Sequence, residues 1–260
     1  MQEGLILEQI SPHRKLQPRC GGRKLYAELQ VFFEQNNIHL GRDKFFELLR
    51  RNKLLVRKRK HHVCTTMSKH HLRRYPNLVK DFTPLKAHEL WVADITYIST
   101  VHRHAYLFLI TDAYSRKIVG FHLGDDMKVS SGILALKKAL AQKPADAIVI
   151  HHSDRGLQYC STEYTNLLLQ NNCMISMTQN GDPYENAIAE RVNGILKTEL
   201  ISSHYKDVTT ASRHIARCIT IYNHRRRHSS LNWQIPEQVH HQQGPQKRQW
   251  KNYYKKSKPQ

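Results

Sequence analysis

Apolar residues recur at helical spacing over residues 23–35 and again over residues 42–52. Between these stretches, the Asn36-Asn37 pair interrupts the pattern, as expected of a turn. Two short amphipathic helices around a turn predict a helix-turn-helix unit over residues 21–58, whose second helix would enter a DNA groove. A small helical unit without any groove contact is the alternative at this stage.

From residue 89 onward the pattern changes from helical spacing to strands. Residues 91–98 are rich in β-branched and aromatic side chains, residues 105–110 form a continuous apolar run, and residues 117–123 follow after a turn. The later elements alternate as a helix over 130–142, a strand over 147–150, a helix over 161–170, a strand over 174–177, and helices over 185–201 and 210–223. This order predicts an α/β fold of the ribonuclease H-like class, a mixed five-stranded sheet flanked by helices.

The expected organisation has six segments. They are an N-terminal extension (1–20), the helix-turn-helix unit (21–58), a basic linker (59–88), a ribonuclease H-like catalytic core (89–203), a C-terminal helix with a basic block (204–240) and a basic, disordered tail (241–260). No apolar run reaches the roughly 18–20 residues that a membrane span needs. No secretory signal is visible, and the five cysteines are widely spaced with no Cys-x-x-Cys pair. We therefore expect a soluble, intracellular protein without a membrane partner.

The formal net charge is +20, and it is unevenly distributed. Residues 1–88 hold 19 Lys/Arg against 7 Asp/Glu (net +12), residues 89–203 hold 10 against 12 (net −2), and residues 204–260 hold 12 against 2 (net +10). Basic flanks suit a polyanion such as DNA. The basic residues expected to contact DNA are Arg57, Lys58, Arg155, Arg225 and Arg226. The slightly acidic middle retains carboxylates that need another explanation.

Two aspartates occupy notable places in the predicted sheet. Asp94 lies in the middle of an apolar strand, where a charged carboxylate is costly without a metal ion or another cation beside it. Asp154 ends the fourth strand, at the sheet edge where α/β proteins commonly bind ligands. Taken singly, Asp94 also fits an ion-paired core residue, and Asp154 fits a helix cap or turn residue. Asp112, near the end of the second strand, is interpreted as a turn former.

Glu190 lies on the helix predicted over 185–201, on the side opposite its apolar stripe. Asn186, Asn193 and Lys197 fall on the same side as Glu190, so one helix face presents a carboxylate, two amides and a cation. A solvated polar face is the alternative interpretation. By the same angles Glu199 falls on the apolar side, and the sequence indicates no function for it.

Hard divalent cations need oxygen ligands that converge from separate elements. Two strand carboxylates, Asp94 and Asp154, and one helix carboxylate, Glu190, can hold two Mg²⁺ (or Mn²⁺) ions around a scissile phosphate. Such a pair of ions activates the attacking oxygen and neutralises charge on the leaving 3′ oxygen. The sequence therefore predicts these three residues as both catalytic and metal-binding.

The spacing of these carboxylates, with 35 residues between Asp154 and Glu190, resembles the D, D-35-E signature of retroviral integrases and many transposases. The surrounding words are more specific: WVADITYI contains Asp94, HSDRGLQY contains Asp154, and NAIAE followed by LKTE surrounds Glu190. They resemble the OrfB transposase of bacterial insertion-sequence family three. Residues 22–56 and 222–236 also resemble that family, so the likeness spans roughly residues 20–240.

This resemblance implies a DDE transposase with an integrase-type catalytic core. Such an enzyme frees a 3′-hydroxyl at terminal inverted repeats and joins it to target DNA, as a homo-oligomer in the bacterial cytoplasm at the nucleoid. It also implies an OrfA-type partner or fusion. Lys197 takes over the family's DNA-contacting role, and Asn186 and Asn193 are expected to contact DNA beside it. Two departures are visible: Glu185 replaces a usual aspartate, and Arg227 stands where proline is frequent.

Two other functions fit parts of the pattern. A ribonuclease H-like nuclease would use the same metal chemistry and cut without joining. A non-catalytic regulator would use the helix-turn-helix unit alone, and the three carboxylates would then serve no purpose. Strand transfer and plain cutting share their metal chemistry, so the three carboxylates do not distinguish them. The family resemblance favours strand transfer.

Overall fold

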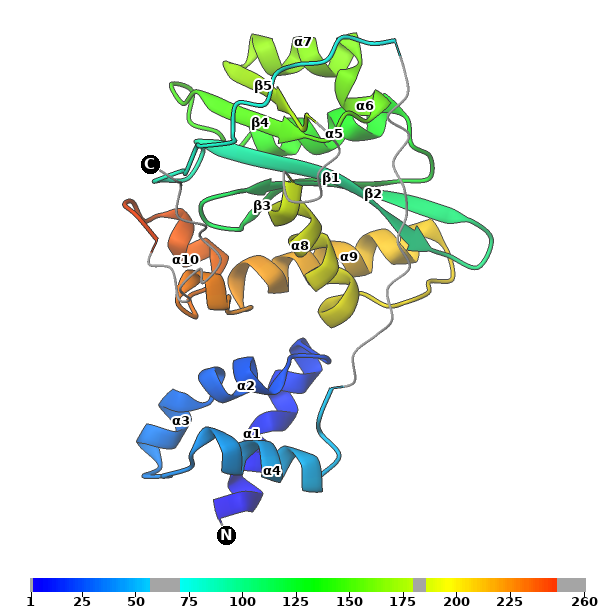
Figure 1. Ribbon diagram of the computed structural model, residues 1–260. Coiled ribbons are helices and arrows are strands. Elements are labelled where there is room, and N and C mark those ends of the chain that lie inside the picture. Colours follow the sequence, from blue (N-terminus) through cyan, green and yellow to red (C-terminus); the bar gives the residue numbers. More distant parts are fainter. Residues whose placement is uncertain (1, 57–70, 180–185, 247–260) are drawn as a thin grey trace, which may run out of the picture.

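A helical unit precedes the sheet in the structure, a computed structural model that describes residues 2–56, 71–179 and 186–246 (Figure 1). The helices of the first described range are α1 (Gln2–Leu16), α2 (Gly22–Glu28), α3 (Gln30–Gln35) and α4 (Arg42–Arg51). The predicted helix over 42–52 is confirmed, whereas the one predicted over 23–35 is divided at Leu29 into α2 and α3. Residues 1–20, interpreted as an extension, instead supply α1.

Helix α1 belongs to the core of this helical unit. Its Ile6 and Ile10 are buried together with Leu25, Leu29 and Phe45 of the later helices. The sequence did not indicate this helix because it contains Pro12, a residue that disfavours a helix interior, and because its apolar positions are few. The helical unit is therefore larger than the segment predicted over residues 21–58.

The predicted mixed five-stranded sheet is confirmed. Its strands are β1 (Leu90–Ser99), β2 (His104–Asp112), β3 (Ile118–Gly124), β4 (Val149–Ser153) and β5 (Cys173–Met177), in the spatial order β3-β2-β1-β4-β5. The first three strands pair antiparallel as a meander, and β4 and β5 add in parallel beside β1. The turn between β2 and β3 is held by Asp112, whose carboxylate accepts hydrogen bonds from the backbone and hydroxyl of Ser115, which confirms its turn role.

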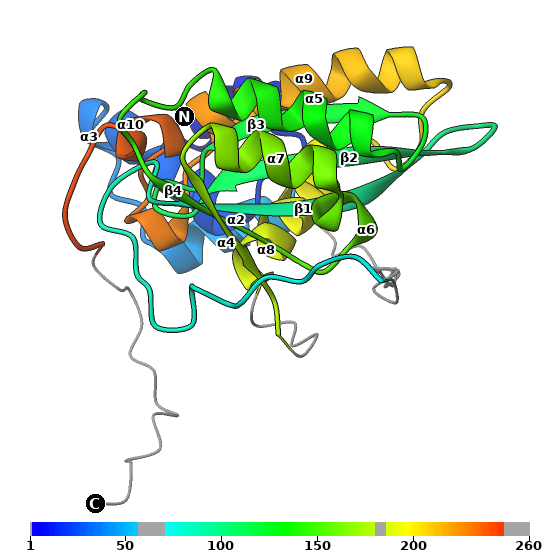
Figure 2. The same cartoon turned by 90° about the horizontal axis from the view of Figure 1, so that it is seen from above.

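Helices cover both faces of the sheet (Figures 1 and 2). On one face lie α5 (Val129–Leu140), α6 (Leu157–Cys160) and α7 (Thr162–Gln170). On the other lie α8 (Ala187–Ile195), its π-helical continuation η2 (Leu196–Leu200) and α9 (Val208–His224). The chain then forms η3 (Ser229–Leu231) and α10 (Pro236–His240). Each face buries its own apolar cluster, which fixes both helix layers on the strands.

Strand β4 starts and ends later than the pattern predicted. The apolar run over 147–150 marked the strand, yet β4 continues through two histidines, His151 and His152, that are 1% and 0% exposed. The Tyr164 hydroxyl oxygen lies 3.0 Å from His151 Nε2, and Ser176 Oγ lies 2.8 Å from His152 Nδ1. These partners satisfy the imidazoles inside the sheet, so polar residues extend the strand to the residue before Asp154.

The C-terminal segment packs on the sheet and its helices, and together they form the second unit of the structure, from residue 71 to residue 246. Ile215, Ile219 and Tyr222 of α9 are buried against the sheet face that also holds α8. Beyond α10, Gln243 forms an antiparallel bridge with Lys86, so residues 241–246 are ordered where the sequence predicted a disordered tail. The rest of that tail lies outside the described residues.

Two further expectations concern the described residues only. Within them, none of the helices combines the length and apolarity that crossing a bilayer requires. Among the described residues, the thiols of Cys20, Cys160, Cys173 and Cys218 are buried and form no disulfide.

Close packing of α5 on β3 depends on Gly120. A methyl group at this position would lie 2.4 Å from Ala135 O and 2.9 Å from Ala139 Cβ, both on the α5 backbone or directly attached to it. We predict that Gly120→Ala lowers the free energy of unfolding by about 1–3 kcal/mol in urea denaturation. The control Gly194→Ala, where nothing lies within 4 Å of the added methyl, should instead stabilise α8 by about 0.5–1 kcal/mol. Equal effects of the two substitutions would contradict the packing argument.

Candidate active site

Asp94 lies in the middle of β1 on the face that α8 covers. Its Oδ1 accepts a hydrogen bond from Ile95 N at 2.9 Å, and its Oδ2 accepts one from Asn193 Nδ2 at 2.6 Å. Burial raises the pKa of Asp94 to about 7, and the charges of Asp154 and Glu190 contribute to the rise, although both hydrogen bonds oppose it. The strand therefore holds a carboxylate that is poorly stabilised by the protein alone.

Asp154 follows directly after β4, which runs parallel to β1. Its Oδ1 accepts a hydrogen bond from Gly156 N at 3.0 Å, so it also serves the turn into α6. Pairing of Val92 with His152 in the register of β1 and β4 brings the end of β4 to the level of Asp94. The register therefore brings Asp154 beside Asp94 on neighbouring strands, and their joint catalytic role stays a prediction.

Glu190 is the exposed member of the set and lies in the first turn of α8. Burial raises its pKa. It is near enough to Asp94 to raise the pKa of that aspartate, yet within the described ranges no three His, Cys, Asp or Glu side chains are close enough to share one ion. The structure thus gathers the three charges in one region without closing them into a ligand shell.

Two amides flank Glu190 on its helix face, and both bind β1. Asn186, at the N-cap of α8, makes no side-chain cap; its Nδ2 donates to Ala93 O at 3.0 Å instead. Asn193 donates to Asp94. The two side chains are buried, so they hold α8 against the strand beside Asp94, a different role from the DNA contact that the sequence predicted. The prediction considered only the helix face and not the strand that covers it.

Arg226 also differs from its predicted role. It is 2% exposed, and its guanidinium binds Glu199. An arginine enclosed in this way is not presented to DNA, so the predicted contact does not fit. Glu199, which helical angles placed on the apolar side, reaches Arg226 from the π-helical turn η2, where the wider turn alters the angular register of the helix.

The other predicted DNA contacts occupy three surroundings. Arg155 is half-buried and its Nε donates to Thr178 O at 2.6 Å, Lys197 is half-buried in η2, and Arg225 is exposed at the end of α9. Arg57 and Lys58 lie outside the described residues, as does Glu185. The structure therefore leaves Arg225 and Lys197 near the sheet face of α8 and α9 without testing their contact with DNA.

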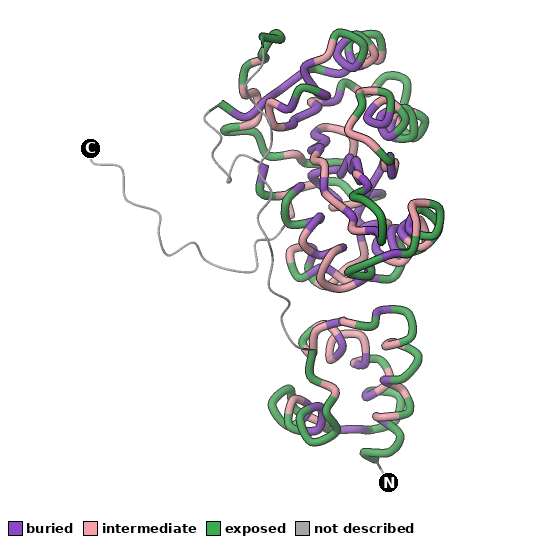
Figure 3. The backbone as a smooth tube through the Cα atoms, turned by 90° about the vertical axis from the view of Figure 1, so that its right-hand side faces the viewer, coloured by how far each residue is buried: buried purple, intermediate pink, exposed green. Residues whose placement is uncertain are grey.

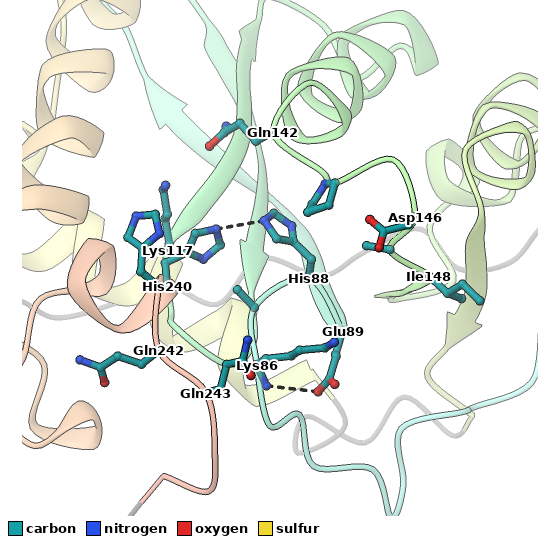
Figure 4. A pocket seen from close by; sticks show the side chains of 14 residues that line it. Lys86, His88, Glu89, Lys117, Gln142, Asp146, Ile148, His240, Gln242 and Gln243 are labelled. Atoms are coloured by element: carbon teal, nitrogen blue, oxygen red, sulfur yellow. Dashed lines mark hydrogen bonds between the residues drawn. The ribbon is translucent and has the colours of Figure 1, made fainter.

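A pocket of about 780 Å³ lies away from the carboxylates, near the start of β1 (Figure 4). His88 and His240 line it, with their Nε2 atoms 3.2 Å apart, and His240 Nδ1 lies 2.9 Å from Ser115 Oγ, which binds Asp112. Burial lowers the pKa of His88 to about 4 and that of His240 to about 3, with Lys117 adding to both shifts. These neutral imidazoles anchor α10 to the β2–β3 turn. The candidate site is instead the region around Asp94, where β1, the end of β4 and α8 meet.

Comparison with known proteins shows the family of this chain. The family described as integrase core domain matches residues 84–183, which include both aspartates, and again residues 171–236, which include Glu190. The insertion element IS600 31 kDa protein of Shigella sonnei is 36% identical over 233 residues, covering 88% of this chain and 84% of that protein.

A second relative is the transposase InsF for insertion sequence IS3fB of Escherichia coli, 34% identical over 171 residues. That match covers 64% of this chain and 58% of InsF, and several other matched transposases are likewise covered over little more than half of their length. Among solved structures, the simian T-cell lymphotropic virus intasome has a chain that matches with a TM-score of 0.53 at 17% identity, covering 92% of this chain and 77% of the other, and it shows the fold alone. On sequence, fold and the position of its carboxylates, this chain belongs to the integrase-core transposases of insertion sequences of the IS3 type.

Proposed function

We propose that Asp94, Asp154 and Glu190 are the catalytic residues of this transposase and bind Mg²⁺ or Mn²⁺, two ions in the working site. The reaction is metal-dependent cleavage of DNA at the ends of an insertion sequence, followed by strand transfer to target DNA. The observation that carries the proposal is the Asp94 carboxylate, which lies in a sheet interior next to two further carboxylates and has a pKa raised to about 7. A cation would relieve the mutual repulsion of the three charges.

The residues around Asp94 fit a hard cation. All three acidic side chains offer oxygen, which Mg²⁺ prefers, and no thiol or imidazole is needed. In addition, Asn186 Oδ1 and Asn193 Oδ1 are buried without a hydrogen-bond partner, which leaves two acceptor oxygens beside the carboxylate. When bound, the ions supply an activated attacking oxygen and charge neutralisation at the leaving 3′ oxygen.

The chain's own side chains then have separable tasks. Asn193 orients Asp94 and favours its charged form by donating to Oδ2. Asn186 fixes the beginning of α8 on β1 and so sets the reach of Glu190. Lys197, on the same helical run, is proposed to hold a DNA phosphate close to these carboxylates.

Further DNA contacts are proposed along the basic flanks. Arg155 and Arg225 are candidates in the catalytic unit, and Arg57 and Lys58 are candidates in the segment that follows α4. The substrates are terminal inverted repeats and target DNA, bound at the nucleoid by a homo-oligomer. An OrfA-type partner or fusion belongs to the same proposal. The two domain boundaries at residues 58 and 88 would separate end recognition from catalysis.

Joining distinguishes a transposase from a nuclease of the same fold. We predict that the purified chain with Mg²⁺ converts labelled terminal-repeat DNA into joined products as well as nicks. Asp154→Asn should reduce joining and nicking by at least about 10³-fold, because a metal ligand is lost. The control Asp146→Asn, an exposed carboxylate on the same unit, should retain full activity. Nicking without any joining would support the nuclease, and joining by Asp154→Asn would refute the assignment of the site.

The raised pKa of Asp94 predicts how stability depends on pH. Because this pKa rises from 3.8 unfolded to about 7 folded, the folded chain binds the proton more tightly, and the free energy of unfolding falls as pH rises through that interval. At pH 8 without metal ions, Asp94→Asn should therefore melt at a higher temperature than the unmodified chain, with no such gain at pH 4. Adding Mg²⁺ should raise the melting temperature of the unmodified chain only. Parallel pH profiles for the two chains would count against this account.

Asn193 should set the pH at which Asp94 becomes active. Asn193→Ala removes the hydrogen bond that favours the carboxylate, so the acidic limb of the cleavage profile should move upward by roughly one pH unit. The concentration of Mg²⁺ that gives half-maximal cleavage should rise in parallel. The exposed Asn166→Ala on α7 is the matched control and should leave both quantities unchanged. A uniform loss of rate with an unmoved profile would indicate a merely structural role.

A further inference from the structure

Glu199 joins parts of the chain that are far apart in sequence. Its carboxylate accepts two hydrogen bonds from Arg226, from Nε to Oε2 at 2.9 Å and from Nη2 to Oε1 at 3.0 Å. It also forms an ion pair with Lys24 Nζ, which comes from α2 of the helical unit. The Lys24 and Glu199 side chains are only 17% and 15% exposed. One carboxylate on the catalytic helix run therefore contacts both the helical unit and the C-terminal segment.

Three more contacts cross the same boundary. Gln17 Nε2 donates to Arg225 O at 3.5 Å, Arg19 donates to Ile201 O, and Arg227 Nε lies 3.2 Å from Glu28 Oε2. We call Lys24, Arg19, Glu28 and their partners on the catalytic unit the Glu199 joint. The side chains that carry these contacts are charged or amide groups.

No apolar cluster spans this boundary within the described residues. The cluster of the helical unit draws its members from residues 6–54, and the clusters of the catalytic unit draw theirs from residue 75 onward. Figure 3 shows buried segments inside each unit accordingly. Contacts of this polar kind between units of one chain resemble transient interfaces, for which relative motion is expected. The Glu199 joint therefore depends mainly on charge.

We propose that the Glu199 joint holds the helical unit reversibly on the catalytic unit. DNA phosphates and salt anions open the Glu199 joint by competing for its cations. Lys24 and Arg19 are held by acceptors of the catalytic unit, and a polyanion offers them equivalent partners. The proposal treats DNA only as a polyanion, so it does not depend on which carboxylates cut.

Release is inexpensive on the side of the catalytic unit. When Lys24 leaves, the bidentate pair with Arg226 still satisfies Glu199, so no buried carboxylate is left without a partner. Lys24 becomes hydrated when it is released. In the Glu199 joint, burial lowers the pKa of Lys24 and the charge of Arg226 lowers it further, whereas the charge of Glu199 raises it. Burial would raise the pKa of Glu199, but Arg226 and Lys24 keep it below its usual value.

The Glu199 joint also connects the helical unit to the helix that carries Glu190. Glu199 lies in η2, which continues α8 without a break from Glu190. Formation and loss of the Lys24–Glu199 contact therefore act on η2, the C-terminal end of the helix whose first turn holds Glu190. This connection rests on the proposed role of Glu190, whereas the release of the helical unit does not.

Energy transfer between two dyes, one on each unit, tests the Glu199 joint directly because it reports the distance between the units. The dyes are placed by unnatural amino acids at the exposed positions Gln35 of α3 and Thr209 of α9 in the full chain. Transfer should fall as salt rises from about 0.1 M to about 1 M, over which the Debye length shrinks from about 10 Å to about 3 Å. It should also fall when duplex DNA is added at low salt without Mg²⁺, so that cleavage plays no part.

Substitution of Lys24 distinguishes the opening of the Glu199 joint from a general effect of the net charge. Lys24→Glu should show at about 0.1 M salt the transfer that the unmodified chain reaches at about 1 M. Lys15→Glu, the same charge change at an exposed position of α1, should behave like the unmodified chain. Near-ultraviolet circular dichroism should be unchanged in both, because the Glu199–Arg226 pair is kept. Transfer in Lys24→Glu equal to the control, or transfer in the unmodified chain insensitive to salt and DNA, would overturn the proposal.

Discussion

Repulsion among the carboxylates of Asp94, Asp154 and Glu190 is the constraint around which the sheet and its helices are arranged. Asp94 is placed in a strand whose neighbours are apolar, and the charges of Asp154 and Glu190 make its ionised form still less favourable. The free energy that holds them together comes from elsewhere, namely the apolar contacts that fix α8 and α9 on the sheet. Under the proposed function, a bound cation would offset this repulsion and favour the charged form of Asp94.

Directional polar contacts supply what apolar packing cannot, the registration of the elements around Asp94. Asn186 and Asn193 bind β1 from α8, and the buried pairs of His151 with Tyr164 and His152 with Ser176 hold β4 up to the residue before Asp154. Apolar contacts alone tolerate small displacements of a helix on a sheet, whereas a hydrogen bond inside the core does not. The site therefore owes its location to the fold and its precision to a few buried amides and imidazoles.

Much of this arrangement was predictable from the sequence. Strand periodicity indicated every strand of the sheet, and the sequence motifs around Asp94, Asp154 and Glu190 indicated the family, while the site that they predict stays a proposal. Three features were not predictable, for physical reasons. Helix α1 has a weak pattern interrupted by proline, β4 continues through histidines whose partners come from distant elements, and the position of Glu199 depends on a π-helical turn. The tertiary contacts of the two histidines, the packing of α1 and the wider turn of η2 cannot be deduced from the local pattern.

The central claim is that the charge cluster around Asp94 is a divalent-cation site. Anomalous X-ray scattering from crystals soaked in Mn²⁺ tests it most directly, because it locates the ion without reference to activity. We expect manganese peaks within coordination distance of Asp94 and Asp154, and loss of those peaks in Asp94→Asn crystals. Peaks only at other groups, such as the His88–His240 pair, with none beside Asp94 would contradict it.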